Sequence, residues 1–265
     1  MRARDAARDL LVAALRVTVR HFFRGLMSRP RRPLATRRIL AASVFALFLS
    51  IGVAGSLASK PLSGFAPDKG TFKILVNGQQ AGKEDFDIGP GGGNGDWIAH
   101  GSSEITTPAG TTNVTGTLEF RADGTPVRYE WSTQGAKKAA ATVTFNGPVA
   151  SIELRIPGAR PFTQQLTFSS PLIVILDNNL YDQYAVLARI YDWEKKGPQT
   201  FPVLVPQENT PGTITVDSLG SQDVDGKKLD ELSVKTEDLE VDVYLDGPRV
   251  VRIVAPSANA EIVRQ

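Results

Sequence analysis

The chain has 265 residues and a formal net charge of +2, but its charges are unevenly distributed. Of the 30 basic and 28 acidic residues, 11 arginines and two aspartates lie in residues 1–58, so residues 59–265 carry 19 basic and 26 acidic side chains and a net charge of −7. An acidic body repels phosphate backbones, so we expect no nucleic-acid binding by this part, and the lack of cysteine excludes disulfide and thiolate chemistry.

The first expected element is an uncharged apolar segment, residues 39–58. As a helix, its 20 residues at about 1.5 Å each reach roughly 30 Å, the thickness of a bilayer core. The preceding arginines, including Arg37 and Arg38, predict that this flank stays in the cytoplasm and that the rest of the chain lies outside it. Residues 39–58 are therefore either a signal peptide, cut after Ala58, or a retained signal anchor.

Residues 1–38 form a basic N-terminal segment. The pattern of residues 1–26 is that of a basic amphipathic helix, which suits an anionic membrane surface. Met27, however, begins a complete signal by itself, so residues 1–26 are alternatively sequence upstream of the true start of translation. Residues 59–69 are expected to link the N-terminal part to a domain.

Residues 70–265 carry the pattern of an antiparallel β domain. Hydrophobic and polar residues alternate, as in Phe72, Ile74 and Val76, which indicates sheets with one buried face. We count about 10–12 such segments, which predicts a mainly β fold: a strongly curved antiparallel sheet, a half-barrel or barrel-like meander, packed around one helix. Five pairs predict tight hairpin turns: Asn77-Gly78, Asp123-Gly124, Asn146-Gly147, Asp225-Gly226 and Asp246-Gly247.

The helix is expected at about residues 178–194. A buried strand or approach, residues 172–176, precedes it; Asp177 or Asn178 is the expected N-cap, and Gly197-Pro198 ends it. The concave face of a curved sheet must be filled, because exposed apolar surface costs roughly 25 cal/mol per Å². The helix is thus either a plug or one wall of a pocket for an apolar ligand, with tyrosine hydroxyls as polar contacts. The candidate ligand-binding residues are Leu180, Tyr184, Leu187, Tyr191 and Trp193.

Catalytic patterns are sparse. His100 is expected to be an ordinary strand residue, and the sequence has neither a Gly-x-Ser-x-Gly elbow nor a His-Glu-x-x-His pair. Asp85 and Asp87 share one face of a predicted strand, which fits a solvated face or, less well, the paired carboxylates of a glycan hydrolase. We expect no catalytic residues, no metal site and no cofactor.

Three blocks carry a resemblance to a known superfamily: residues 70–88, an opening hairpin; residues 176–187, a loop leading into a helix; and residues 241–264, a closing hairpin. Together they resemble the uncharacterised exported β-rich families of the LolA/LolB-like lipoprotein-carrier half-barrels. The resemblance implies a curved antiparallel sheet around a helix, exported to the periplasm; in the carriers this architecture holds acyl chains. Unlike LolB, this chain has no cysteine to accept a lipid.

The leading hypothesis is a non-enzymatic protein of the cell envelope, periplasmic or otherwise extracytoplasmic, either secreted after signal cleavage or anchored in the inner membrane by residues 39–58. Its concave face would hold a lipid-like ligand or a lipoprotein's lipid. One alternative is a structural or interaction protein with a helix-filled core and no ligand. The second is a glycan hydrolase that uses acidic residues.

Overall fold

The computed structural model describes residues 64–92, 96–108, 110–135, 138–206, 210–236 and 239–265. The basic segment, the apolar segment 39–58 and most of the expected linker lie outside the described residues, so the expectations for them stay predictions. Within the described part of the chain, no helix has the length and apolar character needed to cross a membrane.

The described residues form 15 strands, one α-helix and one short 3-10 helix. The strands and helices are β1 (Asp68–Val76), β2 (Gln79–Pro90), β3 (Trp97–Thr107), β4 (Gly110–Phe120), β5 (Pro126–Gln134), β6 (Ala139–Asn146), β7 (Val149–Arg155), β8 (Phe162–Thr167), β9 (Val174–Ile175), α2 (Asp182–Ile190), β10 (Gln199–Val205), β11 (Thr210–Val224), β12 (Lys227–Lys235), β13 (Glu240–Asp246), β14 (Arg249–Ala255), η1 (Pro256–Ala258) and β15 (Ala260–Arg264).

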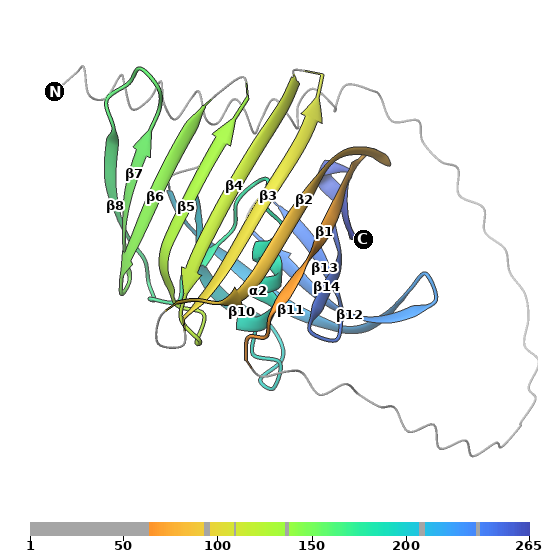
Figure 1. Ribbon diagram of the computed structural model, residues 1–265. Coiled ribbons are helices and arrows are strands. Elements are labelled where there is room, and N and C mark those ends of the chain that lie inside the picture. Colours follow the sequence, from red (N-terminus) through yellow and green to blue (C-terminus); the bar gives the residue numbers. More distant parts are fainter. Residues whose placement is uncertain (1–63, 93–95, 109, 136–137, 207–209, 237–238) are drawn as a thin grey trace, which may run out of the picture. The chain divides into compact units, whose positions relative to one another are not determined.

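All 15 strands belong to one sheet, in the order β8-β7-β6-β5-β4-β3-β2-β1-β15-β14-β13-β12-β11-β10-β9. Neighbours are antiparallel except β9 and β10, which are parallel. The sheet twists and curves strongly, with α2 on its concave side (Figure 1), where α2 contacts both β3 and β14, strands from opposite halves of the sheet. The prediction of a curved antiparallel meander around one helix is confirmed. The sheet does not close, because β8 and β9 end it.

The core lies on the concave face. One row of register partners, Leu232, Val243, Ile253, Ile262 and Ile74, crosses five neighbouring strands, from β12 to β1. Each of these side chains is at most 2% exposed. The alternation seen in the sequence therefore does place one apolar face of each strand inward, as a sheet with one solvated side requires.

The number of strands was underestimated, since about 10–12 were expected and 15 are found. Some of the strands found have weak patterns. β8 (FTQQLT) has one buried residue, Leu166, and β10 has Pro202 at its centre, which argues against a strand because proline cannot donate to a ladder. The strand expected at residues 172–176 shortens to Val174–Ile175.

Each of the five predicted pairs lies in a hairpin loop, but Asp123-Gly124 belongs to a five-residue loop between Phe120 and Pro126 and is not a tight two-residue turn. At Asn77-Gly78 and Asp225-Gly226 both residues have positive φ (52° and 75°, 53° and 78°), as a type I′ hairpin requires. At the two Gly-Pro sequences the loop lies one residue later than expected. Asn146 pairs with Val149 and Asp246 with Arg249, so each loop consists of the glycine and the proline.

Candidate functional site

The candidate site is the surface where α2 and the loop before it meet the concave face of the sheet. Of the five predicted ligand-binding residues, Leu180, Leu187 and Tyr191 are buried, with exposed fractions of 0%, 1% and 2%. Tyr184 and Trp193 are half-buried. Only Tyr184 and Leu187 of the predicted stripe lie within α2, while Leu180 precedes it and Tyr191 and Trp193 follow it. In this structure the chain itself covers the three buried residues.

The helix is shorter than predicted, covering Asp182–Ile190 instead of about 178–194. Asp177, an expected N-cap, instead accepts a hydrogen bond from the Asn179 amide at 3.1 Å, which forms a turn. The N-cap residue is Tyr181, whose side chain caps nothing. Residues 177–181 therefore form a turn and the approach to the helix, which begins at Asp182.

A carboxyl group from β2 caps the helix instead. Glu84 Oε2 accepts a hydrogen bond from the Tyr181 amide at 2.7 Å, and Glu84 Oε1 accepts one from the Asp182 amide at 3.1 Å. These amides have no partner within the helix, so they need an acceptor from elsewhere. Glu84 is fully buried, and it ties the start of α2 to the sheet.

Two glycines open a notch in the concave face where the loop before α2 docks. Gly101 on β3 lies opposite Gly116 on β4. A Cβ at Gly116 would come within 2.4 Å of Leu180 Cδ1 and 2.8 Å of the Tyr129 hydroxyl, and a Cβ at Gly101 would come within 3.1 Å of Leu180 Cδ2. Any side chain at either position would displace Leu180, so the loop packs here because both residues are glycine.

Beside the notch lies a buried polar network. Tyr129 of β5 donates to Asp177 Oδ2 at 3.0 Å and accepts from Gln183 Nε2 at 3.1 Å, while Gln183 Oε1 accepts from the Asp177 amide at 2.5 Å. Burial, followed by the nearby charge of Asp177, raises the pKa of Tyr129 well above its ordinary value. The tyrosine is therefore a neutral donor that links β5 to Asp177 at the start of the loop and to Gln183 in the first turn of α2.

A second carboxyl group lies against Glu84. Asp182, the first residue of α2, is 2% exposed, and its Oδ1 and Glu84 Oε1 both face the Cβ position of Gly101, at 2.8 and 2.9 Å. Burial, then the charge of Asp182, raises the pKa of Glu84 well above its usual range. Burial raises the pKa of Asp182 to about 6. Ionising both of two adjacent buried carboxyl groups is unfavourable, so the pair holds a proton to higher pH than isolated carboxyl groups do.

The other end of α2 is held by a buried ion cluster. Asp68 of β1 accepts two hydrogen bonds from Arg264 of β15, at 2.7 and 3.2 Å, and lies 3.5 Å from Arg189 Nη2 of α2. Arg189 also donates to the Ala66 carbonyl. Burial lowers the pKa of Arg189 and the charge of Asp68 raises it. Arg264 lies over the ring of Phe86, 5.1 Å from its centroid.

Tyr191, one of the two tyrosines that were expected to contact a ligand, is engaged within the protein. The Tyr191 hydroxyl donates to the Gly197 carbonyl at 2.8 Å and accepts from the Ser218 amide at 3.2 Å. Trp193 donates from Nε1 to the Ala188 carbonyl at 2.9 Å and packs edge-on against Tyr191. These contacts fasten the segment after α2 to β11.

The sequence analysis did not identify the residues that anchor α2, although the strand pattern around Glu84 could have indicated that residue. Glu84 occupies an inward position, in register with the buried Phe72 and two residues before the buried Phe86, where alternation calls for an apolar side chain. The aspartates singled out instead, Asp85 and Asp87, point to the opposite face. Asp85 accepts from Thr71 Oγ1 at 2.7 Å and pairs with Lys83 at 3.1 Å.

His100 also lies on the outer face, as expected for an ordinary strand residue. It is exposed, and its Nδ1 lies 2.9 Å from Thr117 Oγ1 on the neighbouring strand. Among the described residues, no group of three or more histidine, cysteine, aspartate or glutamate side chains is arranged to hold a metal ion.

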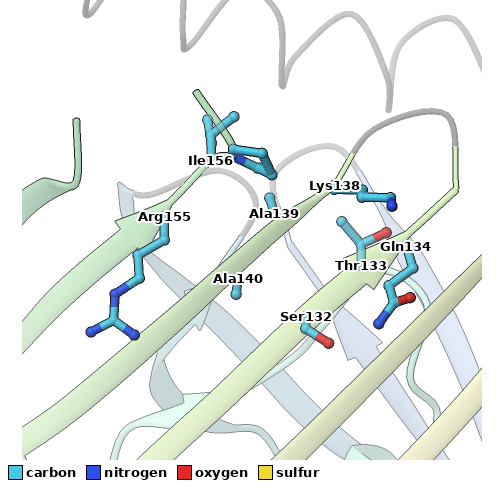
Figure 2. A pocket seen from close by; sticks show the side chains of 9 residues that line it. Ser132, Thr133, Gln134, Lys138, Ala139, Ala140, Arg155 and Ile156 are labelled. Carbon is cyan, nitrogen blue, oxygen red and sulfur yellow. The ribbon is translucent and has the colours of Figure 1, made fainter. Parts of the chain in front are cut away.

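Two open hollows lie away from α2. The first, of about 460 Å³, is formed by side chains near the ends of β5, β6 and β7, among them Ser132, Lys138 and Arg155 (Figure 2). The second, of about 430 Å³, lies over β6, β7 and β8 and is lined mainly by threonine, serine and glutamine. Neither is lined by a predicted ligand-binding residue.

The fold and site together define a barrel-like antiparallel β domain with one helix on its concave face. The chain is similar to a solved structure described as a beta-barrel-like protein of domain of unknown function DUF1849 from Brucella abortus. The TM-score is 0.50 and the identity 9%, over 75% of this chain and 95% of that chain. No family model and no curated protein matches the sequence. At this identity the likeness shows the fold alone, so the expected relation to LolA and LolB remains a hypothesis.

Proposed function

We propose that the protein is an exported, non-enzymatic protein of the cell envelope that binds a lipid-like hydrophobic ligand on the concave face of its sheet, in the place that α2 occupies here. The observation that carries this proposal is the cover over that face. It is a nine-residue helix, too short to be stable by itself, whose start buries two carboxyl groups, Glu84 and Asp182, beside the apolar Leu180. Burying carboxyl groups costs free energy, so they reduce the free energy needed to displace this end of the cover.

One observation favours the alternative of a structural or interaction protein with a helix-filled core. Both ends of α2 are tied down, by Glu84 at the start and by the ion pair between Arg189 and Asp68 at the end. Under this alternative the helix stays in place, and partners would bind the outer surface. The two proposals differ in whether α2 must leave the sheet.

A disulfide that pins the loop before α2 to the sheet separates these proposals. The chain has no cysteine, and the Cβ position at Gly116 lies 2.4 Å from Leu180 Cδ1, so Gly116→Cys with Leu180→Cys places two thiols within reach. We expect the reduced double variant to bind a fluorescent fatty acid and the oxidised form to bind it about tenfold more weakly or worse, because the loop can no longer move.

The measurement is fluorescence titration of one preparation before and after treatment with dithiothreitol. Each single-cysteine variant controls for the oxidant itself and should have the same affinity before and after treatment with dithiothreitol. Equal affinity in the oxidised and reduced double variant would show that the ligand binds elsewhere. If the wild-type protein binds no fatty acid and native mass spectrometry finds no acyl species on it, the helix-filled alternative stands.

A further inference from the structure

The junction between α2 and the sheet contains two carboxyl groups in a place that tolerates one negative charge. Glu84 Oε1 and Asp182 Oδ1 lie 2.9 and 2.8 Å from the Cβ position at Gly101, so both groups meet over that glycine. One charge is stabilised there, because two backbone amides donate to Glu84 and the positive end of the helix dipole lies at the same point. A second charge has no such support.

A proton shared by the two carboxyl groups would supply the hydrogen-bond donor that this contact lacks. Asp182 Oδ1 is buried and accepts no hydrogen bond from a permanent donor. When Glu84 is protonated, its hydroxyl hydrogen supplies that donor, and the carboxyl pair becomes a hydrogen bond between sheet and helix. When the proton leaves, two carboxylates face each other without water, and the same contact becomes repulsive.

Within the described part of the chain, no other charged group at this place compensates for the loss. Asp177, from the loop before α2, adds a further negative charge, while Tyr129 of β5 and Tyr181 are neutral. No lysine or arginine is among the groups that shift the pKa of Glu84 or Asp182. Arg189 faces Asp68 at the other end of the helix.

We propose that Glu84 and Asp182 form a proton-dependent latch, which holds the start of α2 on the concave face at mildly acidic pH and releases it as the pH rises. The latch is a property of the chain without ligand, so it does not depend on the proposed function. If that function holds, the latch also sets the pH at which the concave face opens.

The direction follows from proton linkage. A carboxyl group whose pKa is raised in the latched state binds more protons there than in the released state, so rising pH favours release. For Asp182 the window runs from its ordinary pKa of 3.8 to about 6. Between pH 5 and pH 8 this shift lowers the latching equilibrium constant by about tenfold. Burial also raises the pKa of Glu84 well above its ordinary value, which adds to the loss in the same direction.

Hydrogen exchange of the backbone amides of residues 181–187 tests the latch, once rates are corrected for the pH dependence of intrinsic exchange. We expect their protection factors in the wild-type protein to fall by about tenfold or more from pH 5 to pH 8. In Asp182→Asn the side-chain amide donates to Glu84 and replaces the proton, so protection should stay within about twofold over this range.

Two further variants keep the test decisive. Glu84→Gln also removes the second charge and should likewise abolish the pH dependence, which covers the case in which Asp182→Asn fails to fold. Asp192→Asn is the control. Asp192 lies just after the end of α2, where its Oδ1 accepts hydrogen bonds from the Glu194 and Lys195 amides, so this variant should keep the wild-type pH dependence. A wild-type protein with constant protection, or charge-neutral variants that lose protection as the wild type does, would overturn the latch.

Discussion

Replacing Asp68 with alanine is expected to lower the free energy of unfolding by about 3–5 kcal/mol at neutral pH, the range found when one partner of a buried ion pair is removed. The side chain of Asp68 is 2% exposed, and its two arginine partners, Arg189 and Arg264, are 5% and 14% exposed. Without the carboxylate both guanidinium groups remain buried with their charges uncompensated. Denaturation in urea, followed by circular dichroism, measures the loss.

An exposed ion pair of the same residue types provides the control. Asp225 is 91% exposed and lies 3.3 Å from Arg252, so Asp225→Asn should change the free energy of unfolding by about 0.5 kcal/mol or less, because it removes the charge and keeps a residue type that tolerates the positive φ of this turn. If the two variants lose similar amounts, the buried cluster does not hold α2 and β15 to β1 as we infer. A loss confined to Asp68→Ala supports it.

The fold was predictable because its signals are local. A strand shows its buried face through every second residue, and a hairpin shows its turn through two adjacent residues, as at Asp225-Gly226. The helix was found from the spacing of Leu180, Leu187 and Tyr191, all of which are buried. In each case residues close together in the sequence were sufficient for the prediction, and the residues that pack against them from distant segments were not needed.

The anchors of the helix were not predictable in this way, because they join residues far apart in the chain. Glu84 precedes the amide that it caps by 97 positions, and Arg264 follows Asp68 by 196. The ends of the helix are set by these contacts and by Tyr191, whose ψ of 128° takes the chain out of the helix. Sequence alternation could have marked Glu84 as a buried acid, but it could not have identified Asp182 as its partner.

The role of the glycine notch was equally hidden. Gly101 and Gly116 interrupt two strands, and a glycine within a strand indicates a bulge or the close approach of other atoms without saying which. Only the position of Leu180 shows that both glycines make room for the loop before α2. The candidate site is therefore built mostly from residues whose roles depend on the folded structure.

Replacing Gly116 with alanine is the second large effect that we expect. The new Cβ would lie 2.4 Å from Leu180 Cδ1 and 2.8 Å from the Tyr129 hydroxyl. Both neighbours are fully buried, and neither can move without disturbing the rest of the core. We expect the free energy of unfolding to fall by about 2–3 kcal/mol, as in an overpacked core. Urea denaturation gives this value.

A glycine on an adjacent part of the sheet supplies the matched control. At Gly89 of β2 the nearest atom to a new Cβ is Asp87 Oδ1, at 3.6 Å, so alanine fits there. Because alanine loses less backbone entropy than glycine on folding, Gly89→Ala should leave stability unchanged or raise it by about 0.5 kcal/mol. Both substitutions add one methyl group, so a difference between their changes in the free energy of unfolding reports how much space each site has for that group.

A double-mutant cycle identifies Leu180 as the cause of the loss. Leu180→Ala alone should lower the free energy of unfolding by about 2–5 kcal/mol, since it leaves a cavity beside Gly116. With Leu180 shortened, the methyl group of Gly116→Ala has room, so the double variant should be more stable than the sum of the single losses by about 1 kcal/mol or more. Strict additivity would mean that Gly116→Ala acts through Tyr129 or the backbone, and that the glycine notch does not position the loop before α2.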